Sequence, residues 1–368
     1  MTKIVDIEDI RKKREKKEIG IPIENINKKE LKRRGHEIGD ILGCDEKGEE
    51  ICVRKGKGNL YVDGDMEKEQ LFDFMRSQIY QNIQRGDSMV IVDLGSRIYK
   101  RELWIYLTIH GYRVDSYNMD CMTESDCFNC LDGLGAENEE QIVMIANDII
   151  DDQKYKFMTY PVETACKALL SAVLLASLTE MEESDRNMLE IATIFRLGVS
   201  GTMLDKILHV MFEELDETSS AKQLFAMYSE AEEGIRMEAI QKIGNALAVY
   251  EKRANGSLCD NFRTNRYDME MPVKEKSVLF IESGQLPEDK VLFSVFMERL
   301  YDSMLKKAEE RQQDVTVMLL DYPYYGGLCG LEKYMEEGPE KGICTTLYED
   351  DRKLDGSGYA PHLVELYS

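Results

Sequence analysis

The sequence lacks a long uninterrupted apolar segment, and no apolar stretch follows its charged N-terminus. Its longest apolar run, "ALLSAVLLASL" at 168–178, is too short to cross a bilayer core of about 30 Å. We therefore expect a buried helix there. A secretory signal needs an apolar region behind its first charges, and none is visible. These absences predict a cytoplasmic protein without membrane insertion, whose 9 cysteines are reduced thiols.

A complete zinc-binding pattern is missing as well. The stretch "DCMTESDCFNC" holds Cys127 and Cys130 at the spacing of a metal knuckle. A structural zinc site uses four ligands, usually from two such pairs. No second pair occurs, and the 4 histidines are scattered. We expect no metal site, and we interpret these cysteines as ordinary thiols.

Basic residues are scarce relative to acids. The chain has 70 acidic and 47 basic residues, which gives a net charge of −23. This charge disfavours nonspecific attraction to nucleic acid or anionic membranes, and its simplest role is solubility. The bases gather in a predicted N-terminal arm at 1–33. Such an arm could touch nucleic acid, lipid head groups or an acidic partner, or it could be a solvated, partly helical tail.

The remaining pattern predicts an α/β protein. A chain of 368 residues with 43% hydrophobic residues can bury a core in one or two domains. Apolar runs such as "SMVIVDL" at 88–94 are typical of strands buried on both faces, and they alternate with helix-like segments. This alternation predicts a mostly parallel sheet in residues 34–134 and 271–368. Every segment between them indicates helix, which predicts an inserted all-α domain at 135–270.

One stretch has the order of a phosphate-binding loop. In "NLYVDGDMEKEQLF" at 59–72, a strand leads through a turn and a lysine into a helix. Such a loop needs glycines around the β-phosphate, a lysine for the β and γ oxygens, and a hydroxyl for Mg²⁺. Aligned on Lys68, Val62 and Glu67 occupy the glycine positions and Glu69 the hydroxyl position. Gly64 remains inside the loop.

Acidic side chains make this loop a poor site for a triphosphate. Asp63, Asp65, Glu67 and Glu69 would all approach the phosphates. Like charges about 4 Å apart repel by about 4 kcal/mol at an effective dielectric near 20. We interpret the loop as a vestigial nucleotide site.

A second landmark is the strand "DVTVMLLD", which ends in Asp321. An NTPase uses a carboxylate at this place to hold Mg²⁺, and a following glutamate to orient the attacking water. Here the following residue is Tyr322, which cannot serve as a carboxylate base. An aspartate that only caps the next turn would look the same.

Together these features resemble the conjugative coupling proteins of type IV secretion, the TraG/TraD-like DNA-translocating ATPases. The resemblance covers about residues 39–349 and includes "GDILGCDEKGEEICVRKGKGNLYV", "MVIVDLGSRIYK", "DCFNCL" and "LLDYPYYGGLCGLEKYM". The residues that match the family's motifs are Asp93, Gly95, Phe128, Asn129, Asp321, Gly327, Glu332 and Lys333.

The resemblance implies a RecA-like domain of the P-loop-NTPase type and a helical domain that handles substrates or accessory proteins. The sequence departs from the family in its phosphate loop, at Tyr322, in lacking N-terminal transmembrane helices, and in ending soon after "ICTTLYEDDRKLDG". We therefore expect a catalytically inactive coupling-protein-like component of a conjugative or type IV secretion system. It would bind or regulate protein partners, without a cofactor, and could form homo-oligomers.

Three alternatives remain open. The chain could be a divergent active DNA-translocating ATPase that uses ATP and Mg²⁺ through Lys68 and Asp321. It could be a nucleic-acid-binding module that acts through the basic arm, or a soluble α/β scaffold without a ligand.

Overall fold

The computed structural model of the chain divides into two compact units. Unit 1 comprises Met1–Ser116, Met269–Ser283 and Leu300–Ser368, and unit 2 comprises Tyr117–Asp268 and Gly284–Arg299. The structure describes residues 23–34, 40–44, 50–54, 57–63, 68–94, 98–119, 121, 125–150, 159–198, 202–254, 260–283, 289–319, 330–349 and 364–367. The domain bounds expected from the sequence stay a prediction.

Two sheets carry the described strands of unit 1. The small sheet has the order β1-β3-β2, and the large sheet has the order β10-β4-β9-β8-β5-β7-β6. The strands are β1 (Ile23–Asn27), β2 (Ile41–Cys44), β3 (Glu50–Arg54), β4 (Asn59–Asp63), β5 (Ser88–Leu94), β6 (Arg113–Asn118), β7 (Ser277–Ser283), β8 (Val315–Leu319), β9 (Ile343–Glu349) and β10 (Val364–Tyr367).

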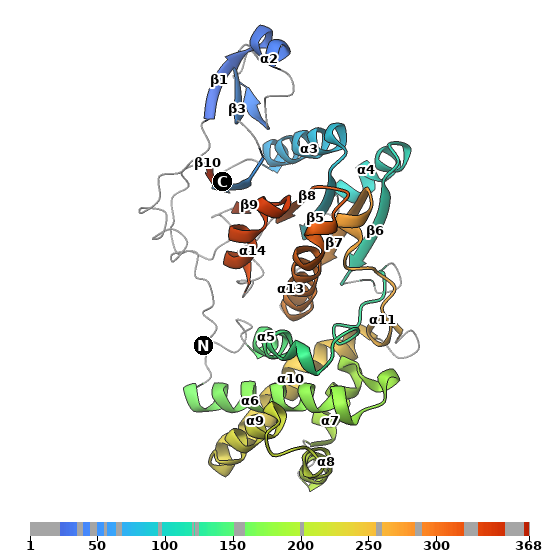
Figure 1. Cartoon of the computed structure of the whole chain (residues 1–368), viewed down its shortest axis with the longest axis vertical. Helices are drawn as coiled ribbons and strands as arrows, with labels where there is room; N and C mark the ends of the chain where they lie inside the picture. Colours follow the sequence, from blue (N-terminus) through green and yellow to red (C-terminus); the bar gives the residue numbers. More distant parts are fainter. Residues whose placement is uncertain are drawn as a thin grey trace. The chain divides into compact units, whose positions relative to one another are not determined.

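The large sheet is mostly parallel, which confirms the predicted fold class (Figure 1). The pairs β4–β9, β9–β8, β8–β5 and β5–β7 are all parallel. Strand β10 adds to β4 in the antiparallel direction. This short edge strand has no counterpart among the predicted elements.

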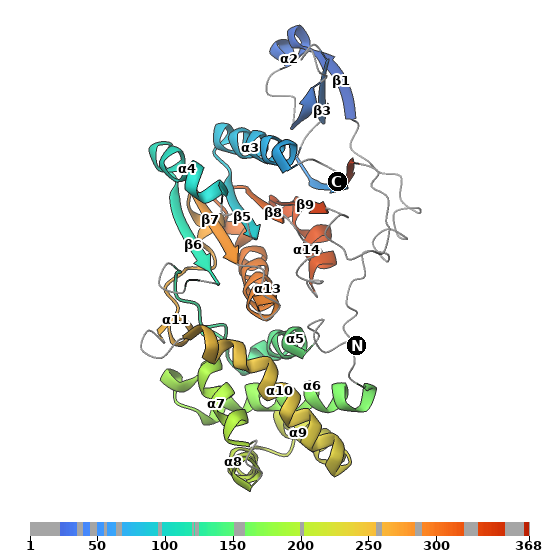
Figure 2. The same cartoon turned by 180° about the vertical axis from the view of Figure 1, so that it is seen from behind.

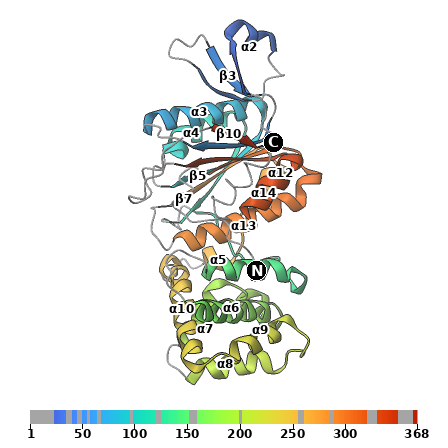
Figure 3. The ribbon, with the colours of Figure 1, turned by 90° about the vertical axis from the view of Figure 1, so that its left-hand side faces the viewer.

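Helices cover both faces of the large sheet. In Figure 3, α3 (Lys68–Arg85) and α4 (Ile98–Ile109) lie on one face, and α12 (Met271–Lys274) and α14 (Leu331–Glu337) lie on the other. Helix α13 (Asp289–Lys307) crosses from unit 2 into unit 1. Strand β5 is apolar on both sides because successive side chains point to opposite faces.

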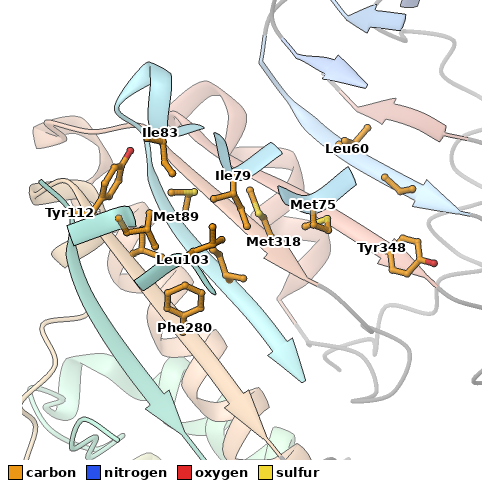
Figure 4. Close-up of a cluster of buried hydrophobic side chains, with 14 residues drawn as sticks. Leu60, Met75, Ile79, Ile83, Met89, Leu103, Tyr112, Phe280, Met318 and Tyr348 are labelled. Carbon is orange, nitrogen blue, oxygen red and sulfur yellow. The ribbon is translucent and has the colours of Figure 1, made fainter. Parts of the chain in front are cut away.

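A core cluster fills the space between the sheet and the pair α3 and α4 (Figure 4). Met75 and Ile79 of α3 and Leu103 of α4 are buried against Met89 of β5 and Phe280 of β7. The helical spacing of the apolar residues in α3 and α4 therefore gathers them on the faces that pack against the sheet.

A glycine follows each of these two helices, α3 and α4. Gly86 follows α3 with φ +84°, and Gly111 follows α4 with φ +77°. Glycine has no Cβ and adopts this left-handed conformation without strain, so each residue ends its helix and turns the chain toward the next strand.

Part of the predicted basic arm is folded. Residues 23–33 form β1 and most of α2 (Lys28–Arg34), and β1 pairs with β3 in the antiparallel direction. The small sheet is joined to α3, because Ile41 N donates to Gln81 and the Ile41 carbonyl accepts from Gln78 and Gln81. The high charge of this region obscured its short apolar alternation.

Unit 2 is mainly helical (Figures 1 and 2). It includes short 3₁₀ turns and the helices α5 (Glu139–Ile150), α6 (Tyr160–Glu180), α7 (Met188–Gly198), α8 (Thr202–Glu213), α9 (Ser220–Ser229), α10 (Glu233–Ala254) and α11 (Asp260–Arg263). Helix α6 packs against α5, α9 and α10. Among the described residues it is the one helix long and apolar enough to cross a membrane, but 78% of its apolar window is buried inside the protein. This confirms the buried helix expected at 168–178.

The segment "DCFNC" forms a buried turn in unit 2. Phe128 packs edge-on against Phe296 with ring centroids 4.9 Å apart. Asn129 donates to the Arg186 carbonyl at 2.8 Å and accepts from Leu131 N at 3.1 Å. Burial raises the pKa of Cys130 to about 12, so this thiol stays neutral at physiological pH.

Candidate functional site

The junction of β4 and α3 is the place of the altered phosphate loop. Val62 is fully buried in β4, and Lys68 and Glu69 are the first residues of α3. Gly64 and Glu67 lie between these elements, outside the described residues. The predicted strand and the helix that follows it are therefore confirmed, with Lys68 as the first residue of the helix, and the altered loop between them stays a prediction.

Strand β8, which precedes the second landmark in the sequence, ends at the same edge as β4. Strand β9 lies between β4 and β8, and its residues Leu347 and Tyr348 pair with Leu319 of β8 and Val62 of β4. Strands in a sheet lie about 4.8 Å apart, so β4 and β8 end roughly 10 Å from one another. Asp321 and Tyr322, which follow β8, lie outside the described residues. The described ends of β4 and β8 thus lie at one edge of the sheet, which is where α/β proteins bind ligands.

A buried asparagine fixes the strand that leads into the loop. The Asn59 side chain donates to the Met335 carbonyl at 2.5 Å and accepts from Thr345 N at 2.8 Å. The Thr345 hydroxyl in turn lies 2.8 Å from the Tyr301 hydroxyl. These bonds join β4, β9 and α14, and sequence reasoning did not identify them.

The opposite, amino edge of the sheet carries a network of alternating charges. Lys57 Nζ donates to Asp87 at 2.7 Å and to Asp314 at 3.0 Å. Arg85 donates to Asp87 at 2.7 Å and to Asp40 at 2.9 Å. This network links the starts of β2, β4, β5 and β8.

Neighbouring charges shift the pKa of two members of this network, Asp314 and Arg85, toward their charged forms. Burial alone would raise the pKa of Asp314, but its hydrogen bond from Lys57 and the charges of Lys57 and Arg311 lower it. Burial would lower the pKa of Arg85, but Asp40 and Asp87 outweigh this effect and raise it.

A polar cavity of about 390 Å³ lies beside the network. It is lined by Arg85, Asp87 and Asp314, together with Glu309, Arg311, Gln312 and Gln313. Its arginines already have carboxylate partners, which weakens the cavity as a phosphate site. We interpret the network as a structural connection between strand ends.

A buried ion pair occupies the carboxyl half of the sheet. Lys100 Nζ of α4 lies 2.8 Å from Glu282 of β7, and the Ser116 hydroxyl donates to the same carboxylate at 2.9 Å. The side chains of Lys100 and Glu282 are only 19% and 4% exposed. The signal in the sequence was a glutamate inside the apolar run "SVLFIES", but its partner lies 182 residues away.

Comparisons with known proteins agree with this architecture. No family model and no curated protein matches the chain. An unbound form of the bacterial conjugative coupling protein TrwBdeltaN70 matches with a TM-score of 0.58 and 15% identity, over 89% of this chain and 70% of that one.

Two ligand-bound structures of the plasmid coupling protein TrwB match as well. The complex with a non-hydrolysable ATP analogue has a TM-score of 0.55 and 15% identity, over 89% of this chain and 72% of that one. The complex with ADP and Mg²⁺ has a TM-score of 0.54 and 14% identity, over 90% and 74%. The resemblance identified in the sequence is confirmed: the chain has the RecA-like α/β fold of the conjugative coupling protein TrwB.

Proposed function

We propose that this chain is a catalytically inactive, coupling-protein-like component of a conjugative or type IV secretion system, and that it binds or regulates other proteins in the cytoplasm. One observation carries the proposal. The fold is that of a protein with solved structures in complex with nucleotides, yet the sequence stretch that aligns with a phosphate loop carries acids at 63, 65, 67 and 69.

Each altered position removes a specific contribution to nucleotide chemistry. Val62 and Glu67 replace the glycines that let backbone N–H groups surround a phosphate. Glu69 replaces a hydroxyl that would ligate Mg²⁺, and Tyr322 replaces the carboxylate that would orient water. Lys68 and Asp321 remain, but they lack these neighbours.

The retained interaction surface in this proposal is the helical unit, which handles substrates or accessory proteins in the family. We infer protein partners from the secretion apparatus and no bound cofactor. Association with DNA is a weaker part of the proposal, because the net charge of −23 opposes it.

A divergent active ATPase is the second candidate, since Lys68 keeps its place at the start of α3 and the two strand ends lie at one edge. Measuring the frequency at which the conjugative element is transferred distinguishes between the two proposed functions. In a strain that lacks the gene, we expect Lys68→Ala and Asp321→Ala variants to restore transfer as well as the wild-type protein. Loss of complementation by both variants, together with ATP hydrolysis by the purified wild type alone, would establish the translocase instead.

A further inference from the structure

Helix α2 presents a concentrated set of positive charges, which we call the basic face and define by its four exposed bases. These are Lys28, Lys29, Lys32 and Arg33. At about 100° per residue, the four positions fall within an arc of about 140° on one side of the helix. Glu30 and Arg34 lie on the other side and are half-buried, so the exposure of the side chains agrees with this arrangement.

The basic face is held on folded structure. The side chain of Asn27, the last residue of β1, accepts hydrogen bonds from Lys29 N and Glu30 N, both at 3.0 Å, which is the geometry of a helix N-cap. The helix packs against β1 and β3 (Figure 1). Strand β2 of the same sheet is bonded to α3 through Ile41. The four bases therefore have a fixed arrangement, which a solvated tail would not give them.

The positive charge is local. The described residues of the small sheet and α2 include six bases and three acids, which gives +3, whereas the whole chain carries −23. The three acids are Glu24, Glu30 and Glu50. Glu30 pairs with Arg33 at 3.1 Å, but the Arg33 side chain remains 75% exposed. Directly after α2 the sequence turns acidic, with eight acids and four bases at 35–65. The basic face is thus small and is followed by acidic sequence.

The size of the basic face favours a short acidic segment over an extended polyanion. A helix of 7 residues is about 10 Å long, which is close to the Debye length at physiological ionic strength. Duplex DNA carries one charge per about 1.7 Å, and an anionic membrane is a continuous charged surface. Most of either would lie beyond the four bases and would meet a chain of −23. A short acidic segment brings its charge to the bases alone.

We propose that the basic face binds an acidic segment of a protein partner, in which several Asp or Glu side chains lie within about 10 Å of one another. This inference rests on the proposed role in binding other proteins, and it assigns that role a surface of unit 1 and a partner of stated charge. Lys28 and Lys32 form one row along the helix, and Lys29 and Arg33 form a second. The two members of a row are separated by a rise of about 6 Å, so neighbouring carboxylates of one segment can pair with both.

Binding of a fluorescein-labelled peptide of alternating glutamate and glycine tests the proposal, with the full chain at low salt and fluorescence anisotropy as the measurement. We expect saturable binding by the wild type, and no binding of the same peptide with glutamine in place of glutamate. The variant Lys28→Gln/Lys29→Gln/Lys32→Gln/Arg33→Gln should weaken binding at least about tenfold, because four exposed ion pairs are lost together. Raising the salt to about 0.15 M should also weaken binding by the wild type, since exposed pairs are screened.

A matched variant separates the basic face from the overall charge of the chain. It replaces four scattered exposed bases of unit 1 with glutamine, and these are Arg101, Arg113, Lys274 and Lys306. The net charge changes by the same amount, and peptide binding should stay within about twofold of the wild type. If the variant of the whole basic face melts early, Lys28→Gln/Lys32→Gln and Lys29→Gln/Arg33→Gln each remove one row and should each weaken binding in part.

The proposal is overturned if the wild type does not bind the peptide, if the basic-face variant binds it undiminished, or if the scattered variant loses as much binding. It is also overturned if the wild type binds duplex DNA or phosphatidylserine vesicles more tightly than the peptide under the same conditions. None of these outcomes involves Lys68 or Asp321. Failure of the basic face is therefore distinguishable from failure of the proposed function, which the transfer assay decides.

Discussion

Removing the lysine of the Lys100–Glu282 ion pair should destabilise unit 1 far more than removing the whole pair. Lys100→Met keeps a side chain of similar length but removes the cation beside the Glu282 carboxylate, which is 4% exposed and still accepts a hydrogen bond from Ser116. Breaking a buried pair in this way costs about 3–5 kcal/mol, because an uncompensated charge stays in a medium of low polarity.

The triple variant Lys100→Met/Glu282→Leu/Ser116→Ala removes the charges and the hydroxyl together. Replacement of a buried pair by apolar side chains is often neutral, so we expect a change within about 1 kcal/mol of the wild type. Thermal melting can resolve this difference, since a change of 1 kcal/mol in the free energy of unfolding shifts the melting midpoint by about 2–4 °C for a unit of roughly 200 residues. Lys100→Met should therefore lower the transition by about 6–20 °C.

The assay is urea unfolding of each variant, followed by circular dichroism, together with thermal melting. Exposed Arg101, the next residue of α4, supplies the control, and Arg101→Met should change the free energy of unfolding by less than about 0.5 kcal/mol. Equal losses for the single and the triple variant would refute the reasoning, because the cost would then come from packing and not from an unpaired charge.

Three further predictions concern other parts of unit 1. Asn59→Ala should cost about 2–4 kcal/mol in urea unfolding, because two buried backbone groups lose their partner, whereas exposed Gln84→Ala should cost almost nothing. The pKa of Asp314 is lowered in the folded protein, so its contribution to stability is present above the ordinary pKa of 3.8 and is lost as the pH falls through the folded-state pKa. Asp314→Asn should therefore lower the urea midpoint at neutral pH and reduce the loss of stability on acidification. An unchanged dependence of stability on pH would refute this linkage. The exposed bases of α2 are Lys28, Lys29, Lys32 and Arg33. Replacing all four with neutral residues should leave the retention of DNA in a low-salt gel shift unchanged, whereas a loss of retention would support a nucleic-acid-binding role.

Local patterns in the sequence predicted most elements of the large sheet. The run "SMVIVDL" is typical of a strand buried on both faces, and Met75, Ile79 and Ile83, at helical spacing in the sequence, form the inner face of α3. Gly86 and Gly111 follow α3 and α4 in a left-handed conformation that suits glycine. Each of these signals lies within a few residues of the feature that it predicts.

Strand order and buried polar contacts could not be predicted in this way. Asn59 meets Met335 and Thr345, which are 276 and 286 residues away, and nothing near Asn59 identifies either partner. The strand β1 was missed for another reason, since its short alternation is embedded in a highly charged region. The fold class depends on local patterns, whereas the network around the site depends on long-range pairing.

The central claim is that the altered loop no longer holds a nucleotide, and thermal melting with and without Mg²⁺–ATP tests it most directly. A ligand at a hundred times its dissociation constant stabilises a fold by about 2.7 kcal/mol, which corresponds to a shift of several degrees. We predict no shift for the wild type at millimolar Mg²⁺–ATP and the same midpoint for Lys68→Ala. A shift of several degrees that Lys68→Ala abolishes would contradict the claim and restore an active nucleotide site to this chain.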